Sequence, residues 1–146
     1  LTGELEFFGV DQRHESDIEG LGRIPSEQQL KSKKVPSFNV IGNSPLVLRE
    51  SLLDEVYTMG ENFVEAAKRI VSPGMNGPFC IEGVYDENAK FTSFEFSARI
   101  VAGTNIYMDG SPYYSLLFNE SMSMGKRIAR EVKIAEEKNE IEKIVT

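Results

Sequence analysis

Hydrophobic and polar residues alternate in two short runs within residues 78–99, PFCIEGVYDENAKFTSFEFSAR, and the polar segment DENAK (86–90) separates the two runs. Alternation with a period of two is typical of β-strands, and the composition of the separating segment is typical of a turn. The pattern therefore predicts an antiparallel hairpin. A turn that pivots between Asn88 and Ala89 places Glu82 directly opposite Glu95.

The two faces of this hairpin differ in chemistry. The face expected to join the core is apolar and comprises Phe79, Ile81, Tyr85, Phe94, Phe96 and Ala98. The other face comprises Cys80, Glu82, Val84, Ser93, Glu95, Ser97 and Arg99. Like charges directly opposite each other destabilise a sheet, and a magnesium or calcium ion between the two carboxylates would convert the pair into a site. The pairing by itself favours a simpler alternative, two solvated carboxylates, because charged strand faces are common.

The rest of the chain predicts an α+β fold, an antiparallel sheet with flanking helices. An apolar stripe with helical spacing covers residues 50–71, and a second one covers residues 121–138. Shorter helices are predicted at 25–30, at 113–118 and in the tail, 136–146. Residues 4–10, 35–41 and 100–102 are predicted to be extended, with a polar loop after the first run and a Gly-Asn-Ser-Pro turn at 42–45 after the second.

Composition narrows the class of protein. A chain of 146 residues with 40% hydrophobic residues is long enough for one domain with a core. A net charge of −7 argues against a nucleic-acid-binding surface, because few phosphates could be neutralised. No apolar run is long enough to cross a membrane, and the single cysteine, Cys80, suits a reducing cytoplasm.

The segment FEFSARIVAGTN (94–105) resembles the metal-binding strand and the following loop of ATP-grasp ligases. The usual pattern of that family is Glu-x-Asn-x-Arg, followed by small residues and a terminal Asn. Glu95 and Arg99 match the pattern, whereas Ser97 stands where Asn is usual. Glu82, on the preceding strand, matches the family's other acidic magnesium ligand.

The whole chain resembles one subfamily, the archaeal formate-dependent ligases that formylate aminoimidazole carboxamide ribotide (AICAR) to its formamido product (FAICAR) in purine biosynthesis. The segments FFGVDQRHESDIEGLGRIP (7–25), FNVIGNSPLVLRESLL (38–53) and MSMGKRIAREVKIAEE (122–137) carry this resemblance beyond the hairpin. It implies that residues 1–146 are the C-terminal ATP-grasp portion of a longer, homo-oligomeric chain. The implied reaction uses ATP and formate and passes through formyl phosphate.

The resemblance also implies roles for five residues. Glu82 and Glu95 would hold Mg²⁺ or Mn²⁺, Glu15 would contact ATP, Asn43 would contact AICAR, and Arg99 would face the transferred phosphoryl group. The residues alone explain Glu15 as one acid in an acidic loop and Asn43 as a turn asparagine. With the resemblance included, the metal interpretation of the glutamate pair is preferred. Two alternatives stay open: another ATP-grasp carboxylate–amine ligase, and a binding module without catalysis.

Overall fold

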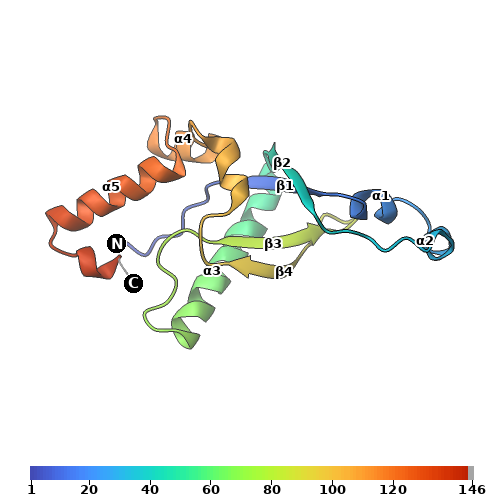
Figure 1. Ribbon diagram of the computed structural model, residues 1–146. Coiled ribbons are helices and arrows are strands. Elements are labelled where there is room, and N and C mark those ends of the chain that lie inside the picture. Colours follow the sequence, from blue (N-terminus) through green and yellow to red (C-terminus); the bar gives the residue numbers. More distant parts are fainter. Residues whose placement is uncertain (145–146) are drawn as a thin grey trace.

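The structure is a computed structural model that describes residues 1–144, and it confirms the α+β class (Figure 1). Its two sheets are both antiparallel and two-stranded, β1–β2 and β3–β4. The strands are β1 Val10–Glu15, β2 Val40–Leu46, β3 Cys80–Tyr85 and β4 Phe91–Ser97. The helices are α1 Ile18–Gly22, α2 Ser26–Ser32, α3 Leu53–Ile70, α4 Pro112–Phe118 and α5 Met124–Glu137, with 3₁₀ turns η1 Glu50–Leu52, η2 Ala102–Tyr107 and η3 Ile141–Lys143.

The register of the β3–β4 hairpin confirms the predicted pairing of the two acids. Glu82 is the direct partner of Glu95. The next residue, Gly83, pairs with Ser93, so the register shifts by one and Phe94 is left without a partner as a bulge. The predicted strand pairing is therefore correct from Cys80 to Glu82, and from Gly83 to Tyr85 the observed pairing differs from it by one residue.

The hairpin turn explains the shift. The Asp86 N–H donates to the Lys90 carbonyl at 3.0 Å, and the Asp86 carboxylate accepts from the Asn88 and Lys90 N–H groups at 2.9 and 2.8 Å. Ala89 adopts a left-handed φ of 60°. The tip is therefore centred on Asn88 instead of lying between Asn88 and Ala89, and the bulge at Phe94 absorbs the difference.

Helix α3 covers one face of the hairpin (Figure 1). The Phe63 ring lies 4.7 Å from that of Phe79 and 5.0 Å from that of Phe96, measured between ring centroids. The predicted core face is only partly covered, because Phe94 and Phe96 remain 62% and 60% exposed. A groove lined by both apolar and polar side chains, Glu55 and Glu95 among them, runs between α3 and this face.

The β1–β2 ribbon differs from the prediction. The strand expected at residues 4–10 begins only at Val10, and the expected loop after it is the strand itself. Strand β2 runs through the Gly-Asn-Ser-Pro segment that predicted a turn. Both faces of β1 carry polar residues, so hydrophobic alternation gave no signal. Pro45 is tolerated because a two-stranded ribbon has only edge strands.

The aromatic residues Phe7 and Phe8 pack against tyrosine rings and do not belong to the predicted strand. Phe7 packs on Tyr113 at 4.6 Å, and Phe8 packs edge-on against Tyr107 and Tyr114 at 5.6 and 4.8 Å. The most buried side chains lie in the same region, at Tyr107, Ser111, Tyr114, Met122 and Ala135. This segment therefore lines the core beneath η2, α4 and α5 without joining a sheet.

The remaining elements position the ends of the molecule. Helices α1 and α2 stand on an arm that projects beyond the β1–β2 ribbon (Figure 1). Residues 100–102 do not continue β4, which ends at Ser97; Val101 is extended, and η2 begins at Ala102. The predicted tail helix shortens to η3, and residues 145–146 of that prediction lie outside the described residues. Over residues 1–144, no helix is long and apolar enough to cross a membrane.

Candidate functional site

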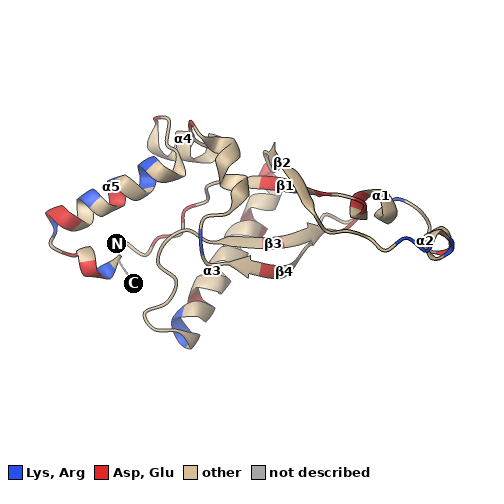
Figure 2. Cartoon of the chain, in the orientation of Figure 1, with Lys and Arg blue, Asp and Glu red and all other residues tan. Residues whose placement is uncertain are grey.

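Strand β1 presents three charged side chains on one face. Successive residues of a strand point to opposite faces, so Asp11, Arg13 and Glu15 share a face. Asn43 joins them from β2, where it is the direct partner of Arg13. Figure 2 shows acidic positions on both β1 and β4 near the centre of the molecule. The two ribbons thus bring their acidic residues toward one region.

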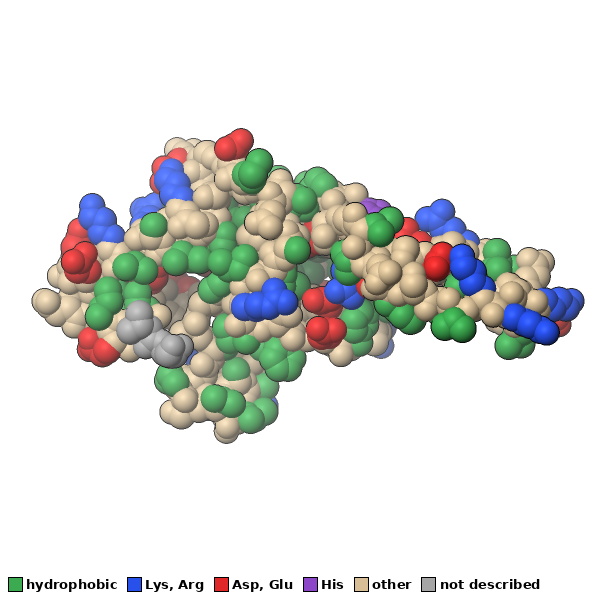
Figure 3. Space-filling view, in the orientation of Figure 1, with side chains coloured by type: hydrophobic (Ala, Val, Ile, Leu, Met, Phe, Trp, Pro, Cys, Tyr) green, Lys and Arg blue, Asp and Glu red, His purple; other side chains and the backbone are tan. Residues whose placement is uncertain are grey.

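Arg13 joins the two sheets. Its Nε lies 2.9 Å from Glu15 Oε1, and its Nη1 lies 2.7 Å from Glu82 Oε2. The carboxylates are only 16% and 20% exposed. Partial burial strengthens such ion pairs, because solvent screens them less. In the space-filling view, acidic and basic side chains lie side by side near the middle of the molecule (Figure 3).

The Glu82–Glu95 pair has the chemistry of a magnesium site completed by a ligand. Glu82 is half-buried and Glu95 is exposed. Within residues 1–144, no group of three or more His, Cys, Asp or Glu side chains is placed to hold a metal ion. Magnesium in nucleotide-dependent enzymes commonly takes one or two carboxylates, with phosphates and water completing an octahedron. Two opposed carboxylates fit that requirement.

Asn43 is held by an acid that the sequence interpretation missed. Its Nδ2 donates to the Asp11 carboxylate. Asp11 in turn packs against Gly103, where an added Cβ would lie 2.2 Å from Asp11 Oδ1. Asn43 therefore stands inside a strand with a fixed amide, and the turn explanation is wrong. The period-two spacing of Asp11, Arg13 and Glu15 was the signal that could have revealed the shared face.

The pKa of the Cys80 thiol is affected by the charged residues of this region. This pKa is raised to about 11, mainly by burial and then by the charges of Glu82 and Asp11, against the opposing effect of Arg13 and Arg99. A thiol with this pKa is protonated at neutral pH, which makes it a poor nucleophile and metal ligand.

Arg99 stands apart from the network around Arg13. Its side chain is exposed, and its Nη1 donates to the neighbouring Ile100 carbonyl at 2.8 Å. His14, on the opposite face of β1, lies 3.0 Å from Glu19 and 2.8 Å from Ser44. The structure thus gathers Glu15, Asn43 and Glu82 around β1, with Glu95 paired to Glu82, and leaves Arg99 outside.

Comparison with known proteins places this site in a family. Residues 1–146 match the family described as Domain of unknown function (DUF1297). The chain belongs to DUF1297. This DUF1297 chain is 86% identical over 146 residues to a protein of Nitrosopumilus maritimus (strain SCM1) named 5-formaminoimidazole-4-carboxamide-1-(beta)-D-ribofuranosyl 5'-monophosphate synthetase. Proteins with the same name from Cenarchaeum symbiosum and Pyrococcus horikoshii are 69% and 51% identical over the same length.

The DUF1297 chain covers 43%, 43% and 44% of these three relatives, so it spans less than half of their length. The chain is also similar to the crystal structure of an IMP biosynthesis protein PurP from Thermococcus kodakaraensis, with a TM-score of 0.78 and 33% sequence identity. The match covers 98% of this chain and 44% of the PurP chain. The resemblance to the archaeal FAICAR-forming subfamily is thereby confirmed.

Proposed function

We propose that this chain is the C-terminal portion of an ATP- and formate-dependent ligase that converts AICAR to FAICAR in IMP biosynthesis. The observation that carries the proposal is 86% identity, over all 146 residues, to a protein named for that product. The relatives' greater length supports a longer polypeptide, in which other segments supply the rest of the nucleotide site. We further propose that the enzyme is a homo-oligomer of the cytoplasm.

The proposed reaction has two steps. An oxygen of formate attacks the γ-phosphorus of ATP, ADP leaves, and formyl phosphate forms. The 5-amino group of AICAR then attacks the formyl carbon, phosphate leaves, and the nitrogen loses a proton. Both steps bring anions together, so catalysis consists largely of positioning and of charge neutralisation.

The proposal gives the gathered residues distinct tasks. Glu82 and Glu95 hold Mg²⁺ or Mn²⁺, which supplies positive charge beside the phosphates. Glu15 contacts ATP. Asn43 contacts AICAR through its carbonyl oxygen or its second Nδ2 hydrogen, since the bond to Asp11 uses one of the two Nδ2 hydrogens. Arg99, whose guanidinium is exposed and bonds only to the neighbouring Ile100 carbonyl among the described residues, faces the transferred phosphoryl group, where a planar fork suits phosphate oxygens.

The test is FAICAR formation by the complete polypeptide with ATP, formate, AICAR and Mg²⁺. Glu95→Gln keeps the shape and removes the charge, so activity is expected to fall most at limiting Mg²⁺. Glu87→Gln, in the exposed hairpin turn, is the matched control and should leave activity unchanged. Near-normal turnover of Glu95→Gln at limiting Mg²⁺ would contradict the metal assignment.

A thermal-shift titration separates the alternatives. The proposed enzyme should be stabilised by Mg²⁺-nucleotide and by AICAR, since a ligand that binds only the folded state raises its stability. Stabilisation by a different amine in place of AICAR would indicate another carboxylate–amine ligase. A binding module without catalysis would show no response to Mg²⁺-nucleotide.

A further inference from the structure

Arg13 occupies the centre of the site and has no role in the function proposed above. Its guanidinium contacts one residue proposed to touch ATP, Glu15, and one proposed to hold the metal, Glu82. These two acids lie on different sheets and are far apart in the sequence. Among the ion pairs of residues 1–144, the Arg13–Glu82 pair is the one that links β1 to β3.

Arg13 contacts the two carboxylates with different nitrogens. Its Nε lies 2.9 Å from Oε1 of Glu15, and its Nη1 lies 2.7 Å from Oε2 of Glu82. A guanidinium is a rigid, permanently charged plane, so a single cation keeps both carboxylates near it. Each carboxylate has two oxygens with several lone pairs, so it can meet a cation or a nucleotide hydroxyl while it stays paired with Arg13.

The acidic side chains around Arg13 need its positive charge. Asp11 and Glu15 share the face of Arg13, while Glu82 and Glu95 are direct partners on the neighbouring hairpin. Asn43, opposite Arg13 on β2, is neutral and donates to Asp11. Without Arg13, the like charges of Glu82 and Glu95 would repel each other, and Glu82 would be free to turn toward solvent.

We propose that Arg13 is a positioning residue that holds Glu15 and Glu82 in place for a Mg²⁺-nucleotide complex. This inference rests on the proposed function, since it takes Glu82 as a metal ligand and Glu15 as an ATP contact. It assigns to Arg13 the task that outer-shell partners of metal ligands commonly perform, which is to fix the orientation of the ligand.

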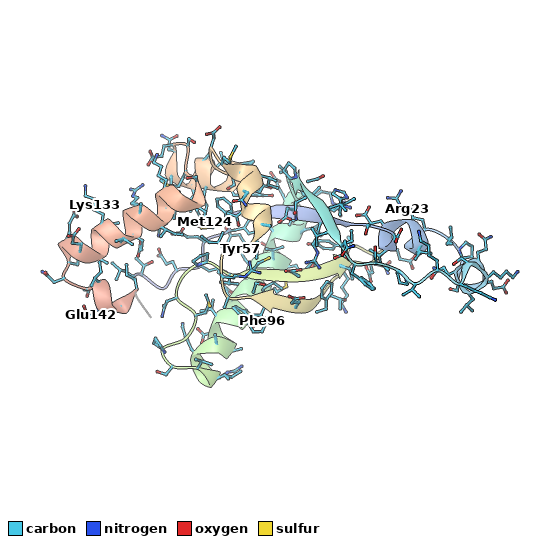
Figure 4. All side chains as sticks on the ribbon, viewed as in Figure 1. Arg23, Tyr57, Phe96, Met124, Lys133 and Glu142 are labelled. Atoms are coloured by element: carbon cyan, nitrogen blue, oxygen red, sulfur yellow. The ribbon has the colours of Figure 1, made fainter. Side chains whose placement is uncertain are left out.

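The first test is metal binding in the complete polypeptide, measured by titration calorimetry of Mn²⁺ in the presence of ADP. Arg13→Met removes both contacts and keeps much of the side-chain volume, so Mn²⁺ affinity is expected to fall about tenfold. Arg23→Met is the control, because Arg23 is an exposed arginine on the distant arm (Figure 4). Circular dichroism and thermal unfolding check that each variant folds.

Arg13→Lys separates positioning from charge alone. Lysine restores the positive charge as a single point and cannot hold two carboxylates in one plane. We therefore expect Arg13→Lys to stay impaired in Mn²⁺ affinity and to show a raised KM for ATP, with a smaller change in kcat. Full recovery by Arg13→Lys, or unchanged Mn²⁺ affinity and ATP KM in Arg13→Met, would overturn the inference.

The same measurements separate this inference from the proposed function. A wild-type protein that binds Mn²⁺ and ADP in an Arg13-dependent way, yet forms no FAICAR, keeps the positioning role and refutes the reaction. A wild-type protein that forms FAICAR with Arg13→Met equally active and equally tight for Mn²⁺ keeps the reaction and refutes the positioning role.

Discussion

Replacing Gly83 with alanine should destabilise the hairpin that carries the proposed metal ligands Glu82 and Glu95. An added Cβ would lie 2.4 Å from the Thr92 carbonyl oxygen and 2.4 Å from Phe91 Cζ. The Phe91 ring can rotate, but the Thr92 oxygen belongs to the backbone of the paired strand. To restore an ordinary contact of 3.4 Å, the strands must separate locally by about 1 Å beside Glu82.

The magnitude follows from two opposing effects. Overpacking of this kind costs about 1–3 kcal/mol, and the lower entropy of the unfolded chain after a Gly→Ala change returns about 0.4–1 kcal/mol. The midpoints of these ranges give a net loss of unfolding free energy of about 1 kcal/mol, which corresponds to a melting temperature lower by about 2–4 °C. Because Glu82 adjoins the disturbed peptide, the stabilisation of the protein by Mg²⁺-nucleotide should also shrink.

Differential scanning calorimetry of the complete polypeptide, with and without Mg²⁺ and ADP, measures both effects. Gly125→Ala in α5 is the matched control, because its added Cβ has nothing within 4 Å and alanine favours a helix by about 1 kcal/mol. A Gly83→Ala protein that melts at or above the wild-type temperature would refute the clash argument. An unchanged response to Mg²⁺-nucleotide would refute the link to Glu82.

Two further predictions concern α5 and Cys80. Arg127 donates to Glu6 from Nε and Nη2 at 2.9 and 2.7 Å and is 19% exposed, so Arg127→Met should lower the free energy of unfolding by about 1.5–3 kcal/mol. Arg130 lies on the same helix but is 50% exposed, so Arg130→Met should cost less than about 1 kcal/mol. Equal losses of the two variants in denaturant titrations would contradict this prediction. The pKa of Cys80 is raised from 9.0 to about 11, so below pH 9 its thiol should be alkylated about a hundredfold more slowly in the folded than in the urea-unfolded protein. Mass spectrometry measures both alkylation rates, and equal rates would contradict the raised pKa.

The hairpin shows what local chemistry can predict. Glu82 and Glu95 were placed opposite each other because the polar turn between them fixes the register of nearby residues. The bulge at Phe94 was missed because it depends on where Asp86 bonds the turn backbone. Helix α3 was predicted within a few residues because its apolar stripe is strong and its charges suit the helix dipole.

The β1–β2 ribbon shows where the sequence alone gives no signal. Its strands carry polar residues on both faces and contain Pro45, so the predicted runs at 4–10 and 35–41 overlap them only at Val10 and at residues 40–41. The contacts of Arg13 with Glu82 and of Asn43 with Asp11 join residues far apart in the chain, and only the fold brings them together. The resemblance assigned Glu15 and Asn43 their roles but offered no reason for Arg13 or Asp11.

The half-covered hairpin has a consequence for handling the protein. Strand β4 pairs only with β3, so its outer backbone groups are open, and its sequence FTSFEFS contains no proline or lysine to discourage pairing with other chains. Its two exposed phenylalanines lie in the same strand. Produced by itself at high concentration, this 146-residue chain should therefore tend to aggregate through β4, and lower expression or a charged substitution on β4 is the direct route to soluble material.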